Sequence, residues 1–282
     1  IWEFAYRREV PPPKIRKGQI PPIIEMPTTA GTGSEVNAGA VITDPTKRVK
    51  RSLFYPDLLA RIVIADPGLT RGLPPFITAA TGMDALSHNL EALCSPSFNP
   101  MLDAIALQGL GYVKNWLPVA FRESRNIRAR IYTMAASIMG AIAFEKGLGA
   151  MHAMAHAVGA HFKIQHGRTI GAVMPYVLRY NRRRISAKMA EAARFLDLPH
   201  HDTGAMVNWI LELRRELGLP ATLGELGVGL EHVPILVDRT LADANAPTNP
   251  VALDPGGVTR LYKWAIEGDM GSPGCKNVVL KI

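Results

Sequence analysis

Cysteine is scarce in this sequence, and long apolar runs are missing. Only Cys94 and Cys275 occur among the 282 residues, far apart and without partners at metal-binding spacing. This usage fits a reducing cytoplasm and excludes a disulfide framework. The longest mainly apolar stretch covers about residues 131–144, which is too short for a membrane span of about 20 residues. Nothing indicates a secretory signal, so we expect a cytoplasmic protein with no membrane partner.

Aromatic residues are few as well, at 7% of the chain, although the formal net charge is +8. The densest basic runs cover residues 47–51 and 182–184. Neither run has interleaved aromatics, and no nucleic-acid-binding fold is recognisable. The runs therefore indicate solvated faces, and no nucleic-acid partner is expected.

Hydrophobic periodicity divides the chain into two parts. It predicts short strands at residues 23–26, 40–43 and 61–65, whereas from about Leu73 onward apolar residues recur every three or four positions, as in helices. We therefore predict an α/β part over residues 1–72 and an all-helical domain over residues 73–282. At the two ends, IWEFAYRREV indicates the tail of a helix, and the segment from Gly268 onward is expected to be poorly ordered.

Histidines gather in one otherwise apolar segment. GAMHAMAHAVGAHFKIQHG contains His152, His156, His161 and His166, which are four of the eight histidines in the chain. A buried imidazole without a partner costs about 1–3 kcal/mol, so each of these side chains needs one. Core histidines with separate partners would explain each position singly.

A carboxylate stands at helical spacing from a further histidine. In TGMDALSHNLEAL, Asp84 and His88 are four residues apart, and His152 and His156 repeat that spacing. Residues i and i+4 share one face of a helix, so their ligand atoms can converge on a cation. One metal held by three imidazoles and one carboxylate would satisfy several groups together, and ligands of this kind suit Zn²⁺ or Fe²⁺. Spacing alone leaves open whether the third imidazole is His156 or His166.

The loop PTTAGTGSEV follows the first predicted strand and combines two glycines with three threonines and a serine. Small residues let backbone amides approach a bound phosphate closely, and hydroxyls add donors. The loop matches neither GxGxxG nor a Walker motif. It predicts either a nucleotide-contacting turn or a plain tight loop.

Three motifs together resemble the iron-containing, group III alcohol dehydrogenases, within the dehydroquinate synthase-like fold. They are PTTAGTGSEV, TAATGMDALSHNLEAL and KGLGAMHAMAHAVGAHFKIQHG, in this order, and DPGLTRGLPP and MPYVLRYN also match. The resemblance covers about residues 22–264. It implies reversible hydride transfer between a small alcohol, or an aldehyde in reverse, and NAD or NADP, with Fe²⁺ or Zn²⁺ as the metal.

The resemblance also implies roles for individual residues. It assigns the metal to Asp84, His88, His152 and His166, and it makes His156 the residue near the substrate that relays a proton. It leaves His161 as a structural or surface residue.

For the cofactor, the resemblance implies that Thr28, Thr29 and Thr32 line the dinucleotide, with Asn37 and Lys50 at its adenosine and ribose side. Residues 47, 48 and 51, the basic neighbours of Lys50, are expected to face solvent.

The resemblance makes the α/β part a partial dinucleotide-binding domain, because relatives carry an upstream βαβ region with a GGGSxxD turn that this sequence lacks. A homo-oligomer is also expected. Two alternatives remain: a chain that keeps metal binding without turnover, and a glycerol dehydrogenase-like or dehydroquinate synthase-like enzyme of the same fold.

Overall fold

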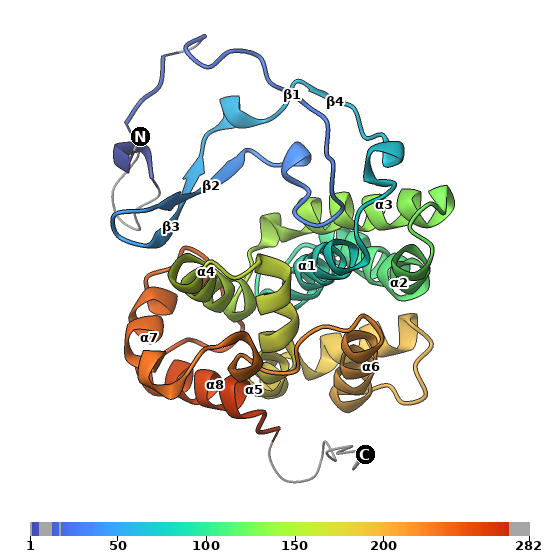
Figure 1. The fold of residues 1–282 in the computed structure, drawn as a ribbon, viewed down its shortest axis with the longest axis vertical. Coiled ribbons are helices and arrows are strands. Elements are labelled where there is room, and N and C mark those ends of the chain that lie inside the picture. Colours follow the sequence, from blue (N-terminus) through green and yellow to red (C-terminus); the bar gives the residue numbers. More distant parts are fainter. Residues whose placement is uncertain (1, 6–12, 17, 271–282) are drawn as a thin grey trace.

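The computed structural model describes residues 2–5, 13–16 and 18–270, with a small β region next to a larger group of packed helices (Figure 1). The strands are β1 (Ile24–Glu25), β2 (Gly39–Asp44), β3 (Val49–Phe54) and β4 (Ile62–Val63). The α-helices are α1 (Pro75–Cys94), α2 (Pro100–Arg122), α3 (Ile127–Ala143), α4 (Ala150–Phe162), α5 (His166–Phe195), α6 (Thr203–Glu216), α7 (Val233–Leu241) and α8 (Pro255–Glu267). Short 3-10 helices cover Trp2–Phe4, Ser34–Val36, Pro56–Leu58, Pro67–Thr70, Phe144–Lys146, Gly224–Leu226, Leu230–His232 and Ala246–Thr248.

The strands form two separate pairs. β1 and β4 are parallel, whereas β2 and β3 form an antiparallel hairpin with Gly39 opposite Phe54 and Asp44 opposite Val49. The three strands predicted from the sequence are confirmed as β1, β2 and β4, although β1 and β4 are shorter than predicted. β3 was not predicted, because it includes part of the basic run of residues 47–51. The charged side chains of that run obscure the alternation of apolar and polar residues that is typical of a strand.

The parallel pair carries exposed apolar side chains. Ile24, Met26, Ile62 and Ile64 are each between 44% and 59% exposed. Parallel strands are usually covered on both faces by other elements. β1 and β4 therefore form a sheet that the described residues leave open.

Five of the helices are preceded by a residue whose side chain caps the first turn. In each case a side-chain oxygen accepts the backbone N–H three residues further on, which satisfies a donor that has no partner within the helix. These residues are Asn99 of α2, Asn126 of α3, Gln165 of α5, Asp202 of α6 and Asp254 of α8. The predicted helical character of the chain after residue 73 is confirmed over the described part.

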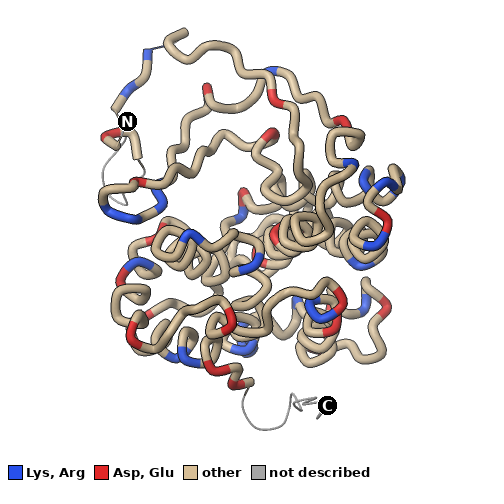
Figure 2. The backbone as a smooth tube through the Cα atoms, viewed as in Figure 1, with Lys and Arg blue, Asp and Glu red and all other residues tan. Residues whose placement is uncertain are grey.

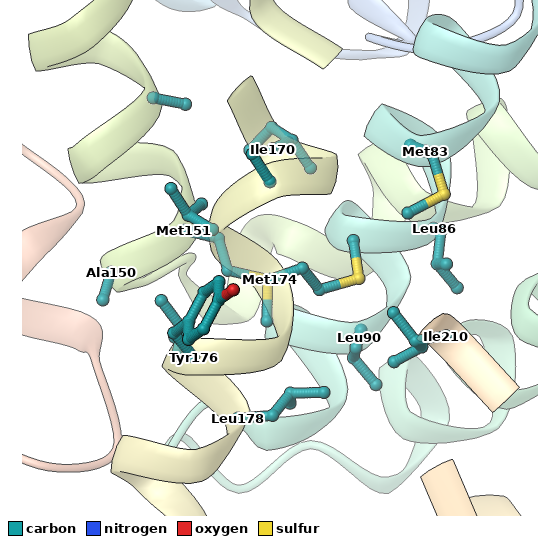
Figure 3. Close-up of a cluster of buried hydrophobic side chains, with 14 of the residues drawn as sticks. Met83, Leu86, Leu90, Ala150, Met151, Ile170, Met174, Tyr176, Leu178 and Ile210 are labelled. Atoms are coloured by element: carbon teal, nitrogen blue, oxygen red, sulfur yellow. The ribbon is translucent and has the colours of Figure 1, made fainter. Parts of the chain in front are cut away.

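The helices enclose one large apolar core (Figure 3). Helix α1 lies against α2, α3 and α5 and is therefore covered on several sides. Its buried side chains include both apolar core residues and polar residues. None of the helices in the described ranges is long and apolar enough to cross a bilayer. The labelled core residues are Met83, Leu86, Leu90, Ala150, Met151, Ile170, Met174, Tyr176, Leu178 and Ile210.

Charged residues are spread over the fold, with Lys and Arg gathered at the turn between β2 and β3 (Figure 2). Lys47 and Arg48 are exposed there as expected. Arg51 faces solvent only in part, because its Nε lies 3.0 Å from Asp44 Oδ2 and its side chain is 21% exposed. Of the helix predicted at IWEFAYRREV, the structure shows one 3-10 turn at Trp2–Phe4, and residues 6–10 lie outside the described ranges. The end of the chain from residue 271 also lies outside them.

Candidate metal centre

Three helices bring one carboxylate and three imidazoles together. Asp84 and His88 lie on buried turns of α1, His152 lies in the first turn of α4, and His166 is the first residue of α5. The helical spacing places Asp84 and His88 on one face of α1. Helix α5 packs against both α1 and α4, and it thereby brings His166 and His152 to that face.

Asp84 Oδ1 is the centre of the cluster. It lies 3.4 Å from His166 Nε2, 3.6 Å from His152 Nε2 and 3.9 Å from His88 Nε2. The ligand atoms of Asp84, His88 and His152 all lie within 4.8 Å of one another. Asp84 Oδ1 and His152 Nε2 are buried and have no hydrogen-bond partner among the described residues. Such atoms normally have a partner, and a divalent cation between them would supply it.

Neighbouring groups orient two of the imidazoles. His152 Nδ1 lies 2.6 Å from Glu91 Oε2, and His88 Nδ1 lies 3.2 Å from the carbonyl oxygen of Gly31. A carboxylate and a carbonyl accept, so both Nδ1 atoms donate, and in the neutral form of each ring the Nε2 lone pair is free for a metal. Glu91 is itself held by the backbone N–H of Met151, at 2.8 Å from Oε1.

Burial and charge shift the pKa values within the cluster. Burial lowers the pKa of His88 to about 3 and that of His166 to about 4. Burial also opposes the charge of His152, but the carboxylates of Asp84 and Glu91 outweigh it and raise the pKa to about 9. Burial would raise the pKa of Asp84, yet the nearby histidines hold it well below its usual value. At neutral pH, His88 and His166 are therefore neutral and able to bind a metal.

Glycines permit the close helix contacts that form the cluster. A Cβ on Gly167 would lie 1.8 Å from the carbonyl oxygen of Ala80, so α5 begins directly against the backbone of α1. Helix α3 also approaches α1 closely, because a Cβ on Gly140 of α3 would lie 2.9 Å from His88 Cβ. These two contacts fix where His166 and His88 stand.

His156 lies one turn after His152 on α4 and lines a cavity of about 300 Å³. Its ring centre lies 5.4 Å from that of His166, next to the cluster. Its Nδ1 lies 2.9 Å from Asp243 Oδ2. Lys50 from β3 lines the same cavity. Burial lowers the pKa of Lys50, while the charges of Asp84 and Asp243 oppose that shift.

The threonine loop adjoins the metal cluster. Its Gly31 accepts from His88, and a Cβ on Gly33, whose φ is +64°, would lie 2.4 Å from Ala141 Cβ of α3. The hydroxyl-bearing residues Thr28, Thr29 and Thr32 are exposed. The loop therefore packs its glycines on the helices and leaves its threonines accessible.

Two residues named from the sequence have protein partners outside the cluster. Asn37 is buried and donates from Nδ2 to Glu145 Oε1 at 3.1 Å. His161 lies away from the cluster, and its Nδ1 accepts from Arg239 at 2.8 Å.

Sequence reasoning missed Glu91 and Asp243, the two carboxylates that contact His152 and His156. A signal existed for Glu91, because it stands seven residues after Asp84 and so on the same face of α1. None existed for Asp243, which lies 87 residues from His156.

Two family models match the chain. The model described as "Fe-containing alcohol dehydrogenase family, C-terminal" matches residues 78–266, and the one described as "Iron-containing alcohol dehydrogenase" matches residues 1–67. Together they cover both the threonine loop and the metal cluster.

Individual proteins are similar over most of the chain. Alcohol dehydrogenase 4 of Schizosaccharomyces pombe is 34% identical over 90% of this chain and 60% of its own length. The 4-hydroxybutyrate dehydrogenase of Cupriavidus necator is 37% identical over 81% of this chain and 62% of its own. The chain thus spans less than two thirds of the length of these relatives.

Solved structures agree with the fold. A 1,3-propanediol oxidoreductase superposes with a TM-score of 0.85 at 32% identity, covering 94% of this chain and 70% of that one. The iron-containing alcohol dehydrogenase of Thermococcus thioreducens also gives a TM-score of 0.85, at 29% identity over 95% of this chain and 70% of the other.

Proposed function

Because the chain belongs to the iron-containing alcohol dehydrogenase family, we propose that it carries the metal site of an NAD(P)-dependent oxidoreductase acting on a small alcohol or aldehyde. The observation that carries the proposal is the position of Asp84 Oδ1, which is buried, has no hydrogen-bond partner within the described ranges and lies within 3.9 Å of three imidazole Nε2 atoms. This donor set contains no thiolate, which fits a catalytic Fe²⁺ or Zn²⁺ site.

Asp84, His88, His152 and His166 would hold the cation. It would act as a Lewis acid toward an alcohol or carbonyl oxygen. The contact with Glu91 keeps His152 Nε2 aimed at the centre.

His156 would move the proton. It lines the cavity next to the cluster. In alcohol oxidation it takes the proton that leaves the alcohol oxygen and passes it to water, and in reduction the transfer runs in reverse. A bound nicotinamide cofactor would supply the acceptor for the hydride of the carbinol C–H bond.

The cofactor would lie along the threonine loop. The exposed hydroxyls of Thr28, Thr29 and Thr32 offer donors there, and the ammonium group of Lys50 is in the neighbouring cavity. Asn37 would join them only by exchanging its bond to Glu145.

In this proposal residues 1–72 are part of a dinucleotide-binding α/β domain and residues 73–282 form the metal-binding domain of a dehydroquinate synthase-like fold. The open parallel pair β1–β4 supports it, since such strands need cover from further α/β elements.

Metal content tests the proposal. Protein reconstituted with Fe²⁺ or Zn²⁺ under argon should hold one ion per chain by elemental analysis, and His152→Ala should lose it. His161→Ala is the matched control on the same helix, because His161 bonds Arg239 outside the cluster. Unchanged metal content in His152→Ala would reject the ligand set.

Turnover is tested separately, by following the absorbance of reduced nicotinamide with short alcohols and aldehydes. Metal-dependent oxidation or reduction supports the proposed activity. One bound metal per chain without any turnover would reject the activity for this chain and leave it as a metal-binding module.

A further inference from the structure

The side chain of Asp243 faces His156, the proposed proton-relay residue, and hydrogen bonds hold it in place. It follows α7, and its backbone N–H bonds the carbonyl of Thr240 at 3.2 Å. Its Oδ1 accepts two bonds from Asn245, from the backbone N–H at 2.9 Å and from Nδ2 at 3.0 Å. Its Oδ2 is thereby left to face His156 Nδ1 at 2.9 Å.

This contact determines which nitrogen of His156 carries the proton. A carboxylate oxygen can only accept, so Nδ1 must donate. A neutral imidazole has one N–H, and its proton is then fixed on Nδ1. Nε2 keeps a free lone pair, and no described residue hydrogen-bonds to it.

Burial makes each partner of the His156–Asp243 contact depend on the other. The side chains of His156 and Asp243 are only 10% and 8% exposed. Leaving either one unpaired at that depth would carry the desolvation penalty of a buried polar group without a hydrogen bond. The pair therefore holds both the orientation and the tautomer of the ring.

We propose that Asp243 is a positioning residue that acts through His156, by accepting the Nδ1 proton and so presenting Nε2 to the cavity as the proton-accepting atom. The catalytic consequence depends on the function proposed above, whereas the tautomer itself does not. The two can therefore fail independently.

The test variant is Asp243→Asn. The two donors of Asn245 keep the amide oxygen in the place of Oδ1, so the new NH₂ group takes the place of Oδ2 and faces His156. An NH₂ group donates, which requires Nδ1 to accept and moves the imidazole proton to Nε2. Asp238→Asn is the matched control, because Asp238 is an exposed carboxylate of α7 that lines the same cavity.

Long-range ¹H–¹⁵N spectra of protein labelled with ¹⁵N-histidine report the tautomer directly, in metal-free and Zn²⁺-loaded samples. The His156 signals are assigned by their loss in His156→Ala. We expect the Nδ1–H form in the wild type and in Asp238→Asn, and the Nε2–H form in Asp243→Asn. An Nε2–H form in the wild type would overturn the proposal even if the variant fails to fold.

Kinetics test the consequence. Asp243→Asn should lower kcat about 100-fold, within the range for loss of a general base, with KM for the alcohol and Zn²⁺ content unchanged. In a His156→Ala background the same substitution should have no further effect, because its partner is gone. Additive losses of kcat would show a role for Asp243 independent of His156 and would refute the proposal.

Discussion

The contact between Gly167 and Ala80 makes a geometric prediction about the metal centre. In Gly167→Ala, the new Cβ would lie 1.8 Å from the carbonyl oxygen of Ala80, whereas such atoms are essentially never closer than 3.0 Å. Because the obstacle is backbone, no side-chain rotation relieves the clash. The start of α5 must therefore move away from α1 by at least 1.2 Å, the difference between these two distances.

That movement carries His166 with it. His166 precedes Gly167, and its Nε2 lies 3.4 Å from Asp84 Oδ1. Metal sites tolerate deviations of only about 0.2 Å in their ligand distances. We therefore expect Gly167→Ala to lose one of four ligands and to bind Zn²⁺ at least about 100-fold more weakly, which corresponds to about 2.7 kcal/mol.

Competition with a chromogenic chelator measures this affinity. Gly171→Ala, one turn later in α5, is the control, since its Cβ would meet Leu219 Cδ1 at 3.6 Å, an ordinary contact. Circular dichroism and thermal unfolding show whether each variant is folded. If a folded Gly167→Ala binds Zn²⁺ as tightly as the wild type and the control, then the approach of α5 to α1 does not position a ligand, and the reasoning fails.

Two further predictions concern the same cluster. In Glu91→Gln the side-chain amide would donate to His152 Nδ1 and move the imidazole proton to Nε2. Zn²⁺ affinity in the chelator assay should therefore fall about 10- to 100-fold. An unchanged affinity would show that Glu91 does not orient His152 for metal binding. In metal-free protein, His88 and His166 have pKa values of about 3 and 4, below the value of about 6.5 expected when unfolded. The unfolded state therefore binds more protons below pH 6.5, so stability in urea should fall as the pH is lowered toward 4, by up to about 1.4 kcal/mol per pH unit for each histidine. A flat profile between pH 6.5 and 4, with Zn²⁺ removed, would contradict the burial of these rings.

Short-range patterns could be predicted from the sequence because they depend on neighbouring residues. The periodicity predicted the helical character of the chain after residue 73 and three of the four strands that the described residues form. β3 could not be recognised, because the sequence VKRSLF gives no clear alternation, and the strand exists through its pairing with β2. Much of what places a segment in a hairpin lies in the partner strand.

The candidate site also has one part that local spacing predicts and one part that it does not. Asp84 and His88 could be paired from their spacing, since a helix puts residues four apart on one face. The choice between His156 and His166 as the third imidazole could not be made from spacing. His156 turns its Nδ1 toward Asp243, whereas His166 points its Nε2 toward Asp84.

The sequence by itself determined which functional groups the chain provides. These are imidazole and carboxylate ligands without thiolates, and a loop rich in glycine and threonine. Residue type and local spacing can be read from the sequence, so these features can be predicted without information on tertiary contacts.

Only the tertiary structure decided which groups share a centre. Asp84 meets His152 and His166 because α5 packs on both α1 and α4, and α5 can begin beside α1 because Gly167 has no side chain to separate it from Ala80. Contacts between residues tens of positions apart depend on how whole helices fit together, and such fits depend on all the side chains at the contact rather than on any local motif.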